Sequence, residues 1–172
     1  MIKIEKYLAP VLMALCGIVW AACKQERQPC LTPKTANLRA EFMHKTSDTA
    51  TVFSDTALPS AIFIALTRSR DTGFVYPLQK SSFSLSLSSD TVFCQWAFRT
   101  DTFSYTVFDT LSFYYQKHRQ FLSNACGFTY FYTLDSIHTS HKMIDSVHII
   151  NSSVTNDVIT PNHLQVYIHP DY

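Results

Sequence analysis

Glycine is scarce in this chain. Only 3 of the 172 residues are glycine, and only Gly73 and Gly127 follow the first 22 residues. Loops that bind phosphate need several glycines, because the backbone must approach the phosphate closely. The sequence therefore excludes such a loop. Its turns must instead rest on Asp, Asn and Ser side chains, which hydrogen-bond to the nearby backbone.

Familiar catalytic and metal-binding patterns are also missing. There is no Gly-x-Ser-x-Gly and no His-Glu-x-x-His, and no cysteine pair has metal-ligand spacing. Glu26 and Glu41 are the only glutamates after residue 22, which gives no evidence for the paired carboxylates of a glycosidase. His138 and His141 would share a face if their segment were helical, but surface histidines explain them better. We therefore predict a protein that is not an enzyme and has no cofactor and no metal site.

An excess of charge of either sign is absent. Removing Lys3, Lys6 and Glu5 from the 14 basic and 13 acidic residues leaves 12 of each. A neutral chain does not attract a polyanion over a long range, so we expect no nucleic acid as a partner. The overall charge likewise gives no sign of an acidic membrane surface as a partner.

The first 23 residues have the features of a secretion signal. Lys3 and Lys6 precede residues 8–20, which carry no charge. This stretch has 13 residues, whereas a transmembrane helix needs about 20, so residues 1–22 are predicted to be a cleavable signal peptide. The end of the segment resembles the motif of bacterial lipoproteins, in which Cys23 becomes the acylated first residue and carries chains such as palmitate. Trp20 stands where that motif has an aliphatic residue, so an ordinary signal peptide with a Cys23 thiol remains the alternative.

Alternation of apolar and polar residues dominates the rest of the chain. Residues 38–42 and 83–87 alternate strictly, which is typical of strands with one buried face. Similar segments recur about every 10–12 residues, a spacing that favours an all-β, antiparallel β-sandwich, Ig-like or related. We predict a lipid-anchored tether at 23–35 and a single β-sandwich domain at 36–172. The expected strands are 36–43, 49–53, 60–68, 81–88, 90–100, 103–108, 111–117, 126–134, 146–150 and 163–169, with a helical turn or a loop at 136–143.

Five cysteines leave three candidates for a disulfide bond. Cys16 departs with the signal peptide and Cys23 takes the lipid. Cys94 lies on the apolar side of its predicted strand, so we expect it to be a buried thiol. Cys30 and Cys126 lie at the edges of predicted elements and are expected to pair in an oxidising compartment.

Aspartate is followed by Ser or Thr at eight of its ten positions. Such a pair can close a turn and open a strand, which is the structural interpretation. The same pattern resembles the O-glycosylation sites of envelope proteins in Bacteroidota-type bacteria. The candidate acceptors are Thr49, Thr56, Thr91, Thr110, Ser136 and Ser146.

Several segments together resemble a family of short, uncharacterised lipoproteins of Bacteroidota-type bacteria. They are CLTP at 30–33, LRAEF at 38–42, DTL at 109–111, FLSNACGF at 121–128, IINSSVTN at 149–156 and HLQVY at 163–167. No activity is attached to that family, so the resemblance transfers no catalytic residues. It supports the pairing of Cys30 with Cys126 and implies an outer-membrane protein as a partner.

These observations predict a non-enzymatic envelope protein of unknown molecular activity that binds or supports another envelope component. Its membrane attachment would be the N-terminal lipid. Lys24, in place of an aspartate after the lipid-bearing Cys, favours the periplasmic face of the outer membrane, with exposure at the cell surface as the alternative. The second hypothesis is a glycan-binding module that uses the tyrosine-rich segments containing Tyr114 and Tyr130. A small hydrolase with a site assembled from distant Ser, His and Asp residues is the third.

Overall fold

The structure is a computed structural model that describes residues 29–45, 53–55, 57–58, 61–67, 73–76, 80–100, 108–159 and 162–169. The chain divides into two units, Met1–Cys30 and Leu31–Tyr172, and the strands of the described residues belong to the second. The predicted signal peptide and Cys23 lie outside the described residues, so they stay predictions. In the described part of the chain, no helix is long and apolar enough to cross a membrane.

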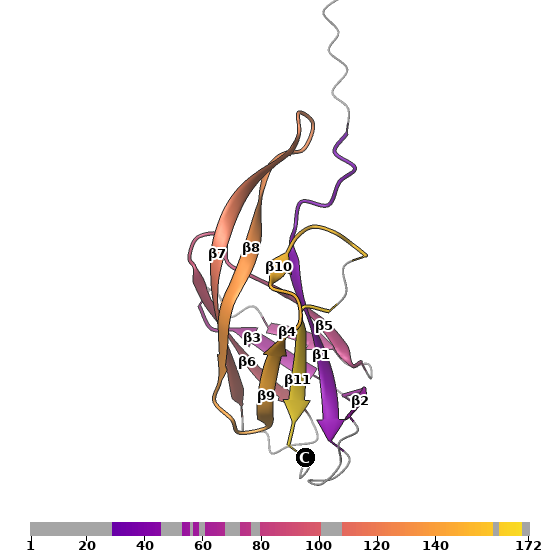
Figure 1. The fold of residues 1–172 in the computed structure, drawn as a ribbon, viewed down its shortest axis with the longest axis vertical. Coiled ribbons are helices and arrows are strands. Elements are labelled where there is room, and N and C mark those ends of the chain that lie inside the picture. The colour runs from indigo at the N-terminus through magenta and orange to yellow at the C-terminus, as the bar shows by residue number, and fades with distance from the viewer. Residues whose placement is uncertain are drawn as a thin grey trace, which may run out of the picture. The chain divides into compact units, whose positions relative to one another are not determined.

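Two β-sheets form the fold, as the alternation predicted (Figure 1). The first sheet contains β1 (Asn37–Lys45), β2 (Phe53–Asp55), β5 (Ser82–Ser86), β9 (Ile144–Ile149) and β11 (Leu164–Ile168). The second contains β3 (Ala61–Ala65), β4 (Gly73–Tyr76), β6 (Phe93–Thr100), β7 (Asp109–Ser123), β8 (Gly127–Thr139) and β10 (Ser153–Val154), in the order β10-β8-β7-β6-β3-β4.

A cluster of phenylalanines joins the two sheets. Phe42 on β1 and Phe83 on β5 come from the first sheet, while Phe63 on β3 and Phe98 on β6 come from the second. The ring of Phe42 lies 4.9 Å from that of Phe98, and the ring of Phe63 lies 5.1 Å from that of Phe83. All four are buried, and each contributes roughly 1.5–3 kcal/mol through its removal from water. The strict alternation of β5 (exposed Ser82 and Ser84, buried Phe83) turns every second side chain toward this cluster.

One strand pair departs from the predicted antiparallel arrangement. β1 and β11 run parallel, with Ala40 opposite Leu164 and Phe42 opposite Val166, while every other strand pair in the described residues is antiparallel. The two strands come from opposite ends of the domain, and alternation within each strand carries no information about the direction of its neighbour. The sandwich is therefore confirmed, with one parallel pair in it.

The segment 136–143, predicted as a helical turn or a loop, is part strand and part loop, with the loop at residues 140–143. Residues 136–139 continue β8, and a bulge next to Tyr114 and Tyr115 shifts the register of β7 against β8. Ile137 packs against the core, which favours strand here over a separate turn. The sequence also did not predict β4 or the two-residue β10. The strand expected at 103–108 lies almost wholly outside the described residues, as does most of the one at 49–53.

The β7–β8 hairpin is longer than either predicted strand, with 15 and 13 residues in its two arms. Its distal half, β7 beyond Tyr115 and β8 before Tyr132, carries mostly exposed or half-buried side chains. In Figure 1 this part extends past the ends of β6 and β11. Gly127 follows the turn and has a φ of +73°. Residues that carry a side chain rarely adopt this backbone conformation, which explains why one of the chain's few glycines lies here.

Candidate ligand-binding cleft

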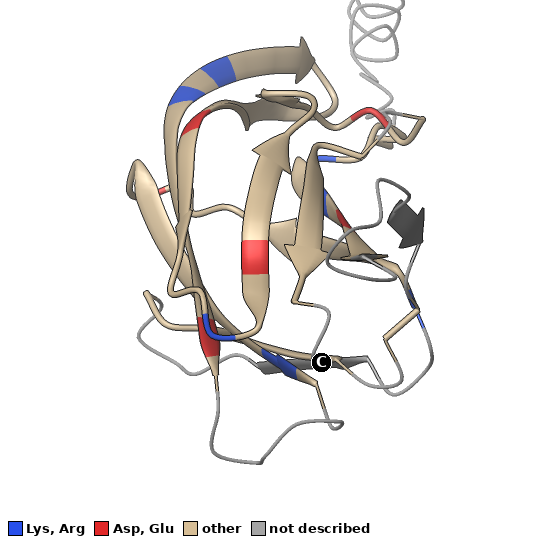
Figure 2. Ribbon diagram, turned by 60° about the horizontal axis from the view of Figure 1, so that its bottom comes forward, with Lys and Arg blue, Asp and Glu red and all other residues tan. Residues whose placement is uncertain are grey.

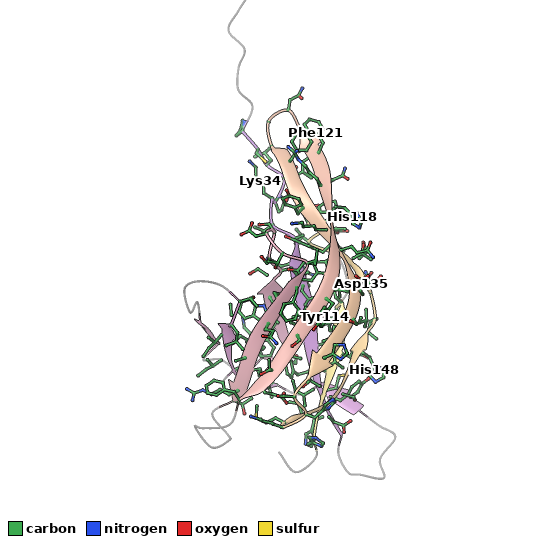
Figure 3. The ribbon with its side chains drawn as sticks, turned by 90° about the vertical axis from the view of Figure 1, so that its left-hand side faces the viewer. Lys34, Tyr114, His118, Phe121, Asp135 and His148 are labelled. Atoms are coloured by element: carbon green, nitrogen blue, oxygen red, sulfur yellow. The ribbon has the colours of Figure 1, made fainter. Side chains whose placement is uncertain are left out.

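A cleft of about 780 Å³ opens beside the distal half of the hairpin. Three segments provide nearly all of its walls: residues 34–37 before and at the start of β1, residues 86–91 after β5, and residues 128–132 of β8. Figure 3 shows Lys34, from the first of these segments, beside the hairpin whose upper part carries His118 and Phe121. The lining is a mixture of hydroxyl groups, amide groups and aromatic rings, with Lys34 and Asp90 as its two charged residues.

Strand register explains why aromatic rings face this cleft. Tyr115 pairs with Leu134 and Arg119 with Tyr130, and alternate residues along each strand share a face. Tyr115, Tyr132 and Leu134 are buried in the sandwich. The same face therefore continues outward, beyond the core, as Lys117, Arg119, Phe121, Phe128 and Tyr130. Of these, Tyr130 is 38% exposed and Phe128 is 54% exposed, and both line the cleft.

Lys117 and Tyr115 connect the hairpin to the opposite wall. The Nζ atom of Lys117 donates to the carbonyl oxygens of Ser89, at 2.9 Å, and Asp90, at 3.2 Å. It also lies 5.8 Å from the centre of the Tyr130 ring. The hydroxyl of Tyr115 donates to the Ser88 carbonyl and accepts from the Ser88 amide. Burial, together with the neighbouring Cys94 thiol, raises the pKa of Tyr115, so this hydroxyl stays protonated and both of its bonds persist at neutral pH.

The segment before β1 is also fixed in place. The Thr129 hydroxyl donates to the carbonyl oxygen of Lys34, and the Asn156 side-chain amide donates to that of Pro33 over 2.8 Å. Cys30 and Cys126 form a disulfide bond, which confirms the predicted pairing, and Cys94 is buried and not disulfide-bonded. The rim of the cleft is thus held by two hydrogen bonds to the backbone of this segment.

Asp109 is a buried carboxylate whose role is structural. Its two oxygens accept seven hydrogen bonds, from the amides of Thr110, Ser140, Lys142, Met143 and Ile144 and the hydroxyls of Thr139 and Ser140. Burial alone would raise its pKa, but the hydrogen bonds outweigh burial and the pKa lies below its ordinary value. The carboxylate organises the connection between β8 and β9. At this position, the Asp-Thr pattern has a sufficient structural explanation.

His163 is a second buried polar residue, and sequence reasoning missed it. Its Nδ1 accepts from the Arg39 amide at 3.0 Å, and its own amide donates to the Arg39 carbonyl. Burial lowers the pKa of this imidazole; the nearby backbone of Ser153 opposes the effect, and the charge of Arg39 adds to it. His163 is therefore neutral at pH 7 and joins β1 to the start of β11. The only sequence signal was its position directly before an alternating strand.

The remaining predicted sites are scattered. Thr49 and Thr56 lie outside the described residues, whereas Thr91 is exposed on the loop before β6 and lines the cleft. Thr110 on β7, Ser136 on β8 and Ser146 on β9 are half-buried. Their glycosylation stays a prediction, which intact-mass measurement on protein from the native host would test.

His138 and His141, which would share a face only in a helical segment, make separate contacts in the structure. His138 packs edge-on against Tyr114, at 5.6 Å, while His141 Nδ1 lies 2.8 Å from the carbonyl of Asp145. Over the described ranges, no group of three or more His, Cys, Asp or Glu residues could hold a metal ion. The cleft is therefore the strongest candidate for a functional site in this part of the chain.

Comparison with known proteins gives the family but no activity. No curated protein and no solved structure matches the chain. Residues 61–168 match a family of unknown function, and this match covers more than half of the 172 residues, from β3 through β11. The segments that line the cleft at 86–91 and 128–132 lie within it. The chain belongs to the family of unknown function designated DUF6452.

Proposed function

We propose that the protein is a non-enzymatic module that binds a saccharide of the cell envelope in the cleft beside the β7–β8 hairpin. The observation that carries this proposal is the ring of Tyr130, which is partly exposed and faces a cleft of about 780 Å³. Pockets of roughly 300–1,000 Å³ are the usual size for small ligands. The volume therefore suits one or a few sugar rings.

The chemistry of the walls favours a neutral saccharide. A sugar ring presents C–H groups on its faces and hydroxyl groups around its edge. Tyr130 and Phe128 offer aromatic faces to the C–H groups, and Ser86, Ser88 and Thr91 offer hydroxyl groups to the edge. The opposite charges of Lys34 and Asp90 leave the lining without a net formal charge, so it does not select an ionised ligand.

The buried titratable groups support a role without catalysis. The carboxylate of Asp109 is occupied by seven hydrogen bonds inside the sandwich. His163 is hydrogen-bonded to the backbone of Arg39, where it joins β1 to the start of β11. A general base must lie within hydrogen-bond reach of the proton that it removes. Neither residue is among those that line the cleft.

The predicted signal peptide supports placing this module in the cell envelope, and the resemblance to lipoproteins of Bacteroidota-type bacteria supports such a bacterium as its source. Acylated Cys23 would hold it at the outer membrane, on the periplasmic face, and an outer-membrane protein would be its protein partner. An intact-mass measurement tests whether Cys23 carries the lipid. Mild cross-linking followed by pull-down from membranes tests whether an outer-membrane protein binds the module. Failure to recover any envelope protein would count against the partner but not against the cleft.

Saccharide binding is tested with the full mature chain on an array of envelope oligosaccharides, neutral and charged. Tyr130→Ala is expected to weaken binding about five- to tenfold, because an aromatic contact contributes roughly 1 kcal/mol beyond its buried area. Tyr114→Ala is the matched control, since Tyr114 is 43% exposed on β7 but does not line the cleft. An equal loss in both variants, or no binding by the wild type, would contradict the proposal.

A further inference from the structure

We propose that the tip of the β7–β8 hairpin contacts the lipid surface to which Cys23 is attached. The contact would use Phe121, Phe128 and Arg119. This inference rests on the lipid anchor proposed above, and it adds a second point of attachment that is not covalent. Phe128 also lines the saccharide cleft, whereas Phe121 and Arg119 do not, so the contact can be tested apart from the cleft through Phe121.

The covalent structure keeps the tip near the anchor. Cys126 lies in the turn between β7 and β8, and its disulfide partner Cys30 follows Cys23 by seven residues. Seven residues extend at most about 25 Å, at roughly 3.3–3.6 Å per residue. The disulfide adds about 6 Å between the two Cα atoms. Cys126 can therefore never be more than about 31 Å from the lipid-bearing residue.

The tip presents an apolar surface of a kind suited to a membrane interface. Phe121 is 47% exposed, Phe128 is 54% exposed, and their ring centres lie 5.1 Å apart. The guanidinium of Arg119 lies 4.0 Å from the centre of the Phe128 ring. A single exposed apolar side chain is ordinary in a soluble domain. Here two aromatic rings in contact and a stacked cation occupy the one end of the domain that the disulfide ties to the anchor.

The charge of the hairpin complements an anionic lipid surface. Residues 116–134 contain Lys117 and Arg119 but no Asp or Glu, although the whole chain is almost neutral. Figure 2 shows two basic bands close together on the curved hairpin strand, with an acidic band on the neighbouring strand, farther from the tip. Basic residues close to a membrane are attracted by anionic head groups. Asp109 and Asp135 lie on the same hairpin, so the basic charge is confined to its distal half and overall composition does not reveal it.

The test places a tryptophan at the tip of the full mature chain. Phe121→Trp is reconstituted in vesicles of phosphatidylethanolamine and phosphatidylglycerol whose acyl chains are brominated, since bromine quenches tryptophan fluorescence at short range. Tyr114→Trp is the matched control, because Tyr114 has similar exposure on the same strand but lies nearer its start. The native Trp96 is buried and gives the same background in both variants.

We expect the added tryptophan of Phe121→Trp to lose at least about half of its emission, as an interfacial aromatic would, and that of Tyr114→Trp to lose little. Equal emission with and without bromine in both variants would overturn the contact. An intact-mass measurement separates two explanations of a negative quenching result. A chain that carries the lipid but shows no quenching keeps the anchor and loses only the tip contact, whereas a chain without the lipid overturns the anchor and this inference together.

Discussion

The Nζ atom of Lys117 lies 2.9 Å from the carbonyl oxygen of Ser89, so a side chain of β7 holds the loop that forms the opposite wall of the cleft. The same ammonium group lies over the Tyr130 ring. Lys117 therefore contacts both the loop opposite the hairpin and the ring proposed to bind the ligand.

Lys117→Met should widen the cleft without unfolding the domain. We expect saccharide affinity to fall about tenfold and the free energy of unfolding to change by less than about 1 kcal/mol, because the two lost hydrogen bonds are at the surface. Calorimetric titration and urea denaturation measure the two effects. Lys142→Met, at another exposed lysine side chain, should change neither. A parallel loss of stability and affinity in Lys117→Met would mean that the lysine supports the fold rather than the site.

Asp109→Asn should be strongly destabilising. The substitution removes the charge that seven donors surround and turns one acceptor into an amide donor, so we expect a loss of about 3–5 kcal/mol. Asp135→Asn is the control, since Asp135 is exposed and accepts one bond from Gln116; it should cost less than about 0.5 kcal/mol. The midpoint of urea unfolding measures both. Similar midpoints for the two variants would contradict a structural role for Asp109.

The lowered pKa of Asp109 predicts how the free energy of unfolding changes at acidic pH. Its pKa is lowered in the folded state, so the unfolded chain takes up a proton first as the pH falls. The stability that Asp109 contributes is complete above its unfolded pKa of 3.8 and is lost as the pH falls through the lower folded value. Asp109→Asn should lack this part of the acid response. An identical acid profile in the variant and the wild type would refute the assignment.

His163 should produce a separate response at higher pH. Its pKa is also lowered by burial, so between its unfolded value of 6.5 and the folded value the unfolded chain binds more protons. Stability should therefore fall as the pH drops from 7 toward 5, by at most about 1.4 kcal/mol per pH unit. The slope should be smaller in His163→Gln and unchanged in His118→Gln, whose side chain is exposed on the hairpin. A slope that survives in His163→Gln would place its origin elsewhere.

The disulfide bond should contribute strongly to stability. Cys30 and Cys126 are far apart in sequence, and closing a loop of roughly a hundred residues gives about 4 kcal/mol in the chain-entropy model. Reduction should lower the urea midpoint accordingly. Labelling under denaturing but non-reducing conditions should modify Cys94, which is not disulfide-bonded, and neither Cys30 nor Cys126. A peptide map that placed Cys94 in the bridge would contradict the pairing.

Alternation was enough to predict the sandwich, because burial on one face of a strand is a local property. Leu38, Phe42, Phe83 and Leu85 are all buried where period-2 patterning placed them. The direction of β11 beside β1 is not local, since it depends on how the two ends of the domain meet. Turn chemistry likewise marked Asp109, but its partners, thirty and more residues later, could not be inferred from the Asp-Thr pair.

The cleft could be predicted only in part. Tyr130 and Tyr132 share one face of β8 and both line the cleft, yet Tyr132 is 6% exposed while Tyr130 is 38% exposed. The two exposures differ because the hairpin extends past the end of β11 (Figure 1). The length of the hairpin depends on the pairing of β7 with β8, which the sequence of either strand alone does not give. Lys117 and the 86–91 loop gave no signal, since nothing local connects them.

The most direct test of the cleft as a binding site is an NMR titration of the full mature chain with the best neutral oligosaccharide from the array. If the cleft binds the sugar, amide shifts will concentrate in residues 34–37, 86–91 and 128–132. Their midpoint will move to about five- to tenfold higher sugar concentration in Tyr130→Ala and stay in place in Tyr114→Ala. Shifts elsewhere on the sandwich, or an unchanged midpoint in Tyr130→Ala, would contradict it.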